Sequence, residues 1–141
     1  MHSNIESNQF TCHYNNITEF DKQLLRIILQ LDDGSHYICF RANLHLEDKF
    51  IKFKEEYTSF IDTLEQSLKR WCACYITANG KDFKFFTNVI SSFYIFTPNK
   101  EDSPIITINI AREFSVAVPK IIKEFQQETT KELPFSSNEK F

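Results

Sequence analysis

The sequence predicts an α+β domain with a mostly antiparallel sheet of about five to six strands. Three observations lead to this class. Short stretches of alternating apolar and polar residues lie between turn-forming residues, which is typical of strands. Residues 48–70 instead carry large apolar side chains three or four positions apart, which is typical of an amphipathic helix. The 141 residues are 42% hydrophobic, 25% charged and 15% aromatic, the composition of a globular chain.

The domain boundaries follow from where these periodic patterns begin and end. We expect one domain with one hydrophobic core over residues 1–128, in which the polar segment 1–20 is loosely attached. Residues 129–141 show no sustained period, so we expect a flexible tail there.

Residues 22–31 and 36–46 predict a β-hairpin. The first stretch, KQLLRIILQL, alternates with the two-residue period of a strand, and the second, HYICFRANLHL, does the same. Between them lies DDGS, whose glycine tolerates positive φ and whose aspartates bond their own backbone. The two strands should therefore pair with each other.

The helical spacing over residues 48–70 predicts one long helix. Asp48 is the expected N-cap, because its carboxylate can accept from the free N–H groups of the first turn. Such a helix needs a partner for its apolar stripe, so we place it across the hairpin. The stripe consists of Phe50, Phe53, Tyr57, Phe60, Ile61, Leu64, Leu68 and Trp71.

A second set of strands is expected in the C-terminal half. Residues 72–77 predict a short strand, and Asn79-Gly80 is a tight-turn signal that opens a second hairpin. The next segment, DFKFFTNVISSFYIF at 82–96, carries aromatic residues on both faces and should turn or bulge near Asn88. The β-branched run at 105–110 predicts another strand. A shorter C-terminal helix is expected at about 116–128.

The charge balance argues against a nucleic acid partner, and the lack of a long apolar window argues against a membrane span. The formal net charge is −3, the wrong sign for a protein that binds phosphate backbones. Lys81 and Lys84 precede the aromatic segment, but residues 85–99 contain no basic residue, so core or protein interface is favoured over base stacking. The first residues show no signal peptide and no window is apolar enough to span a bilayer, so we expect a cytoplasmic protein.

The cysteines are expected to be free thiols. Cys72 and Cys74 would share one face of the strand at 72–77, where they could ligate a soft metal if Cys12, His13 or Cys39 folded nearby. No second cysteine pair has a metal-like spacing, so we expect small buried thiols and no metal.

No motif for catalysis is evident. The chain has two glycines, Gly34 and Gly80, which rules out phosphate-binding loops that need several glycines close together. His36 and His45 are nine residues apart, a spacing that would place them on opposite faces of a regular strand. We therefore expect no enzyme and no cofactor.

Two groups of residues are candidates for binding a protein partner. The acidic residues of the long helix have two interpretations: an ordinary solvated face, or a patch that steers a basic partner. The aromatic residues would stay available if both predicted helices covered the same side of the sheet. The candidates are Asp48, Glu55, Glu56, Asp62, Glu65, Phe86, Tyr94 and Phe96.

The order of these elements resembles a family of bacterial immunity proteins. The resemblance lies in LLRIILQLDDGSHYICFRANLHL leading into FIKFKEEYTSFIDTLEQSLKR, and in ITINIAREFSVAVPKIIKEF, and covers about residues 22–127. The chain looks like the WapI-type and related immunity proteins of contact-dependent growth inhibition. This implies a cytosolic antitoxin that binds one cognate toxin, such as a nuclease, and blocks its active site or substrate access. The alternative is a non-enzymatic adaptor or self-assembling subunit.

Overall fold

The computed structural model describes residues 10–14, 16–99 and 103–112, and it confirms the α+β class. The expected helix at 116–128 and the tail at 129–141 lie outside the described residues. The strands are β1 (Phe10–His13), β2 (Tyr37–Arg41), β3 (Tyr75–Asn79), β4 (Lys84–Asn88), β5 (Ile90–Phe96) and β6 (Ile105–Ile110). The helices are α2 (Glu19–Leu31), α3 (Leu44–Asp48), α4 (Phe60–Ala73) and the 3-10 helix η1 (Ile51–Glu56).

The described strands form two antiparallel sheets instead of the single sheet expected. The first sheet has the order β1-β3-β4 and the second sheet has the order β2-β6-β5. Val89 joins them, because its N–H donates to the carbonyl of Cys74 at 2.9 Å and its carbonyl accepts from Ala111 N–H at 3.4 Å. The break expected near Asn88 is therefore the point where one strand passes from the first sheet to the second.

The predicted strand at 22–31 is wrong, because these residues belong to helix α2. The helix starts with a capping box, in which Thr18 Oγ1 accepts from Asp21 N–H at 3.1 Å and Thr18 N–H donates to Asp21 Oδ2 at 2.9 Å. The side chains that bury do not alternate, since Leu24 and Leu25 are buried together and Ile27 and Ile28 are buried together. Buried residues at these positions, i, i+1, i+3 and i+4, lie on one broad face of a helix.

The predicted first hairpin is also wrong. β2 pairs with β6 instead of with residues 22–31, and Tyr37 lies opposite Asn109. The strand ends at Arg41, because Asn43 caps α3 by accepting from Leu46 N–H at 3.0 Å.

The long helix expected at 48–70 is divided into three pieces. Asp48 is the last residue of α3 and caps nothing downstream, whereas α4 begins after Ser59, whose hydroxyl accepts from Asp62 N–H at 3.3 Å. The chain bends because its aromatic residues gather around Phe20. The ring of Phe20 lies 4.5 Å from Phe50, 5.7 Å from Phe53, 6.1 Å from Tyr57 and 6.4 Å from Phe60.

The second hairpin is confirmed, with shifted bounds. β3 begins at Tyr75 and not at Cys72, which still belongs to α4. β3 pairs with β4 so that Asn79 lies opposite Lys84, and the N–H of Gly80 donates to the Phe83 carbonyl at 2.9 Å. A Cβ at Gly80 would lie 1.9 Å from the Phe83 ring, so this position accepts no side chain without displacing that ring.

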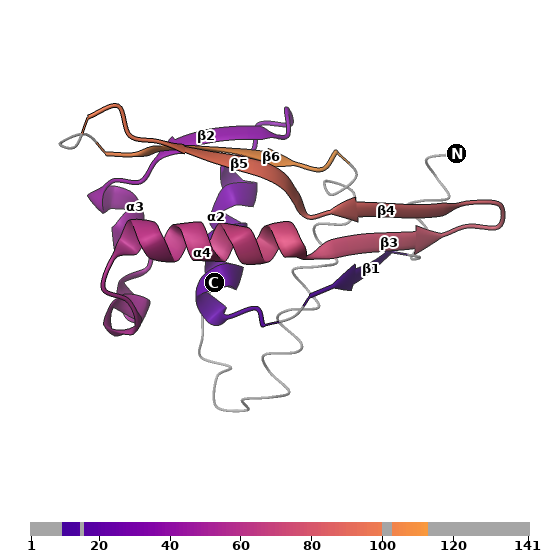
Figure 1. The fold of residues 1–141 in the computed structure, drawn as a ribbon, viewed down its shortest axis with the longest axis horizontal. Helices are drawn as coiled ribbons and strands as arrows, with labels where there is room; N and C mark the ends of the chain where they lie inside the picture. The colour runs from indigo at the N-terminus through magenta and orange to yellow at the C-terminus, as the bar shows by residue number, and fades with distance from the viewer. Residues whose placement is uncertain (1–9, 15, 100–102, 113–141) are drawn as a thin grey trace.

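The two long helices lie on the same side of the second sheet. Figure 1 shows α4 running beneath β5 and β6, with α2 crossing behind it, while the β3–β4 hairpin extends away to one side. None of the described helices is long and apolar enough to span a bilayer. The largest completely buried side chains are Trp71, Phe50, Leu24, Leu25, Ile28, Leu64, Leu68, Ile76, Ile90, Ile106 and Ile108.

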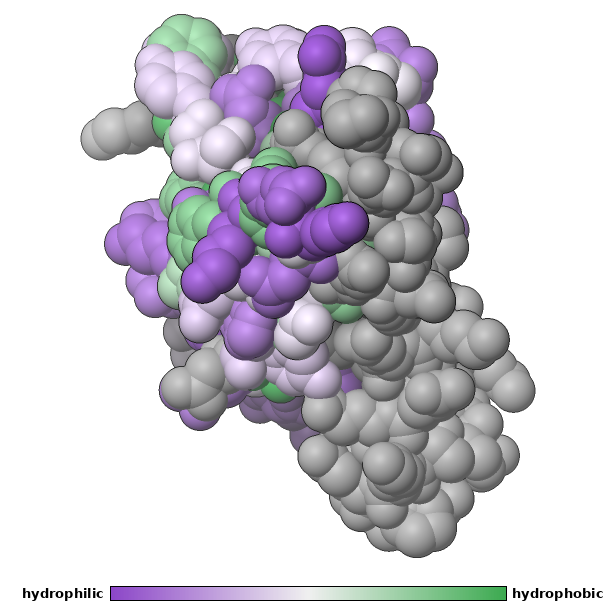
Figure 2. Space-filling view, turned by 90° about the vertical axis from the view of Figure 1, so that its right-hand side faces the viewer, coloured by the Kyte–Doolittle hydropathy of each residue, from purple (hydrophilic) through white to green (hydrophobic). Residues whose placement is uncertain are grey.

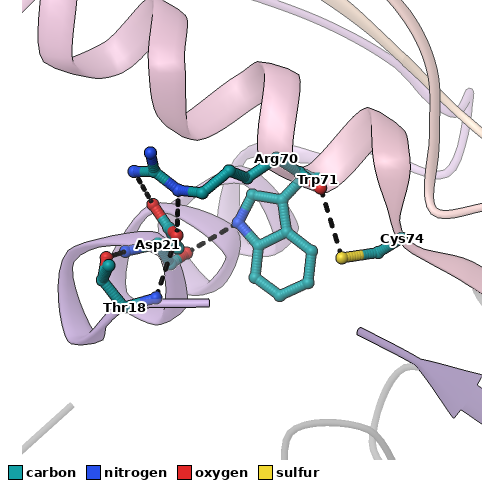
Figure 3. A network of polar contacts seen from close by, with 5 residues as sticks. All are labelled: Thr18, Asp21, Arg70, Trp71 and Cys74. Atoms are coloured by element: carbon teal, nitrogen blue, oxygen red, sulfur yellow. Dashed lines mark hydrogen bonds and ion pairs between the residues drawn. The ribbon is translucent and has the colours of Figure 1, made fainter. Parts of the chain in front are cut away.

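A buried carboxylate connects α2 to α4 (Figure 3). Asp21 is completely buried and accepts two hydrogen bonds from Arg70, 2.7 Å from Nε and 2.8 Å from the second guanidinium nitrogen. These bonds raise the pKa of Arg70 above its ordinary value. The indole N–H of Trp71 donates to the backbone carbonyl of Asp21 at 2.8 Å. Two consecutive residues of α4 are thus bound to one residue of α2.

Candidate binding surfaces

The outer face of the second sheet presents aromatic side chains in register. Cys39, Thr107 and Tyr94 lie side by side across the three strands, and the next row consists of Arg41, Ile105 and Phe96. Residues opposite one another in an antiparallel sheet place their side chains on the same face. The rings of Tyr94 and Phe96 stack 6.1 Å apart at an interplanar angle of 14°.

This face of the second sheet is exposed to solvent, whereas the opposite face is buried. Tyr37 is 54% exposed, Tyr94 59% and Phe96 43%, whereas Ile106 and Ile108 point into the core and are 0% exposed. We name this surface the second-sheet face. It consists of Tyr37, Cys39, Arg41, Ser92, Tyr94, Phe96, Ile105, Thr107 and Asn109.

The outer face of the first sheet carries a row of three rings from three strands. His13 of β1 stacks on Tyr75 of β3 with centroids 4.5 Å apart and an interplanar angle of 15°. Tyr75 lies 5.0 Å from Phe86 of β4. His13 Nε2 is also 2.8 Å from the hydroxyl of Thr77, which holds the imidazole in place. We name His13, Tyr75 and Phe86 the ring ladder.

A shallow hollow lies against the ring ladder. Its volume is about 410 Å³, within the range typical of small-molecule sites. Lys84 and Asn79, both exposed, lie at the hairpin end of the first sheet. The hollow is lined by His13, Tyr75, Thr77, Asn79, Lys84, Phe85 and Phe86.

The structure separates the three aromatic residues that the sequence singled out. All three side chains are accessible, because Phe86 is 59% exposed, Tyr94 59% and Phe96 43%. Phe86 belongs to the first sheet, however, while Tyr94 and Phe96 belong to the second. They therefore form two surfaces, and their role in binding stays a prediction.

The acidic candidates do not line one face of one helix, which corrects the expected arrangement. Asp48 ends α3, Glu55 and Glu56 end η1, and Asp62 lies in the first turn of α4, all of them exposed. Glu65 is half-buried and forms an ion pair with Lys69 at 3.1 Å.

Lysines are interleaved with these acidic residues. Lys49, Lys52 and Lys54 are exposed on the same stretch of chain as Asp48 and Glu55. The mixture of signs supports the interpretation of a solvated surface, because opposite charges close together weaken the field that would steer a partner.

The thiols lie in different environments. None of the four cysteines, all within the described residues, forms a disulfide: Cys39 is exposed on β2, and Cys74 is buried with its thiol donating to the Arg70 carbonyl at 3.2 Å. Burial raises the pKa of Cys72, which lowers its thiolate fraction and hence its nucleophilicity. Cys72 lies in α4 and Cys74 follows it, so the expected pair on one strand face is wrong.

The histidines do not share a strand either. His36 precedes β2 with a left-handed φ of 66°, and its N–H donates to Asp32 Oδ1 at 3.1 Å. His45 is exposed on α3. Within the ranges that the structure describes, no three His, Cys, Asp or Glu side chains are grouped so that they could hold a metal ion.

The sequence alone did not predict the ring ladder. Only its Phe86 was selected, because His13 and Tyr75 are 62 positions apart and become neighbours through the pairing of β1 with β3. The TCH tripeptide at 11–13 is too short to predict a strand from its period.

Comparisons with protein-family models, with curated proteins and with solved structures found no match to this chain.

Proposed function

We propose that this protein acts without catalysis, by binding another protein through the second-sheet face. The observation that carries the proposal is a set of in-register apolar side chains, of which Tyr37, Tyr94 and Phe96 are exposed and Ile105 is half-buried. Large exposed apolar patches rimmed by polar residues are typical of protein interaction sites.

The composition of the face fits the anatomy of a protein interface. Aromatic residues and arginine are enriched in interface centres, where a few of them contribute most of the binding energy. Tyr94 and Phe96 are already ordered by stacking on each other, so binding would cost them little side-chain entropy. Ser92, Thr107 and Asn109 supply a neutral polar surround, in which Asn109 donates to Ser92 Oγ at 3.0 Å.

The partner we propose is a cognate bacterial toxin, which this protein would neutralise in the cytoplasm by covering its active site or substrate path. The support is the resemblance to immunity proteins, now carried by helix α4 and the strand β6 at 105–110. Residues 22–31, which the resemblance treats as a strand, are helical. A self-assembling subunit remains the alternative, because a second copy could occupy the same apolar face.

The test combines binding with protection. The product of the neighbouring open reading frame is expressed with and without this protein, and the complex is measured with purified components. We expect one tightly held polypeptide whose toxicity disappears on co-expression. The double variant Tyr94→Ser and Phe96→Ser should lose protection, because each removed hot-spot ring costs about 2 kcal/mol or more of binding free energy.

The matched control is Phe86→Ser. It removes an equally exposed ring from the first sheet and should leave binding and protection intact. Unchanged affinity of the double variant would overturn the assignment of this face. The self-assembling alternative would be supported instead by two results together: the parent protein is an oligomer that binds no toxin, and the double variant is a monomer.

A further inference from the structure

We propose that the ring ladder and Lys84 form a second site, on the first sheet, which binds a nucleobase that carries a phosphate group. This goes beyond the proposed protein interface, which lies on the other sheet.

The ladder provides a surface for a flat ring. Its three rings are in contact from β1 to β4, and the last of them, Phe86, is 59% exposed. Each ring of the ladder is braced by its neighbour, and His13 is also held by Thr77. Proteins bind unpaired bases by stacking them on aromatic side chains presented by adjacent strands. A nucleobase can lie against the exposed ring of Phe86 over the hollow.

The positive charge of Lys84 beside the ring ladder favours an anionic ligand. The chain as a whole is acidic, with a net charge of −3, yet the residues lining the hollow include Lys84 and no aspartate or glutamate. A lysine ammonium is a common phosphate ligand because it acts as a compact point charge. Lys84 stands two residues before Phe86 on β4, so both side chains point to the same face of the sheet.

The turn of the hairpin continues this polar end. A neighbouring hollow of about 430 Å³ is lined by Lys81, Asp82 and Lys84 among others, which gives the turn one more lysine than acid. Figure 2 looks at this end of the molecule and shows hydrophilic residues gathered directly beside hydrophobic ones. A ligand with one flat apolar part and one charged part matches that juxtaposition.

Neutral polar groups complete the site. The amide of Asn79 can both donate and accept, and the Thr77 hydroxyl lies between the ladder and the hairpin end. Base edges present the same mixture of donors and acceptors. A nucleoside phosphate could be free in solution or could be the end of a single strand, since both present a base next to a phosphate.

The experiment follows backbone amide shifts of the isotope-labelled full chain during titration. The probes are adenosine monophosphate, a short oligouridylate, adenosine and inorganic phosphate. We expect saturable shifts at Thr77, Lys84 and Phe86 with the first two probes. Phe86→Ser and Lys84→Ala should each weaken binding by about tenfold, the size expected for one stacked base or one phosphate contact.

The control variant is Tyr94→Ser, which removes an equally exposed ring from the second sheet and should leave nucleotide affinity unchanged. Because the three altered side chains are exposed, the fold should survive, and circular dichroism checks this. Tighter binding of the oligouridylate would identify a strand end as the ligand, and equal binding would identify a free nucleotide.

Three results would overturn the proposal: no saturable shift at the ladder, shifts that persist in Phe86→Ser, or shifts produced equally by inorganic phosphate, which would mean an adventitious ion only.

Discussion

At the scale of single residues, Asp21 is the most constrained position described. Its carboxylate has no exposed surface, and a buried charge is stable only when it is paired and hydrogen-bonded. Arg70 donates two hydrogen bonds to it, and Thr18 N–H donates a third. Since Asp21 and Arg70 are 49 residues apart, this pair specifies how α2 crosses α4.

The pair predicts an asymmetric response to mutation. Arg70→Leu leaves the buried carboxylate without its cation and should lower the free energy of unfolding by about 3–5 kcal/mol. Asp21→Asn should cost less, because the Arg70 side chain is 32% exposed and can turn to water. Urea unfolding of both variants measures the difference.

The control is Lys69→Ala, which breaks the solvent-accessible ion pair with Glu65 at the residue adjacent to Arg70. Surface pairs of this kind contribute about 0–1 kcal/mol, so this variant should stay close to the parent protein. If Arg70→Leu were no less stable than Lys69→Ala, the buried pair would not organise the helices.

At the scale of elements, the beginnings of helices depend on caps more than on the apolar period. The spacing of aromatic residues from Phe50 to Phe60 is helical, yet the chain is extended at Tyr57 and Ser59 before α4 begins. The aromatic residues keep their spacing because they all contact Phe20, and the cap at Ser59 restarts the helix.

The position of the cap leads to a second prediction. Ser59→Ala removes the side-chain acceptor for Asp62 N–H and should lower the free energy of unfolding by about 1 kcal/mol. Ser59→Asp retains an acceptor and should restore stability. Chemical denaturation with a two-state fit provides the measurement.

Asp48→Ala is the comparison variant for Ser59→Ala, because the helical period of the sequence predicted the helix N-cap at Asp48. Asp48 is exposed at the end of α3, so the substitution should leave stability within a few tenths of a kcal/mol. A larger loss in Asp48→Ala than in Ser59→Ala would contradict the observed division of the helices.

At the scale of the whole molecule, the two sheets share one core. Val89 is completely buried and hydrogen-bonded toward both β3 and the end of β6. Ile76 of the first sheet and Ile106 of the second are completely buried in the same cluster. Each three-stranded sheet buries its apolar face only by packing against another element.

A shared core predicts one cooperative unfolding transition. Trp71 is the single tryptophan of the chain and is completely buried between the helices, so its fluorescence reports on the core. Its transition in urea should coincide with that of far-UV circular dichroism. Two separate transitions would show that the β3–β4 hairpin unfolds independently of the helices and the second sheet.

The candidate surfaces also belong to this scale. Phe86, Tyr94 and Phe96 could be selected from the sequence because the segment 82–96 holds more aromatic residues than one sheet face can bury. Their division between two sheets could not be foreseen, since it depends on the change of partner at Val89. Tyr37 joins Tyr94 and Phe96 on one face only because β2 and β5 both pair with β6.

The sequence by itself determined the α+β class, the hairpin around Asn79-Gly80, the break near Asn88 and the strand at 105–110. These features are local, because a two-residue period and a turn signal act over a few neighbouring residues. Residues 22–31 are helical partly for a local reason, the capping box between Thr18 and Asp21, which the alternating pattern obscured. Tertiary structure decided that β2 pairs with β6 and that His13 reaches Tyr75. Each of these depends on contacts between segments far apart in the chain, where burial against a partner outweighs the local period.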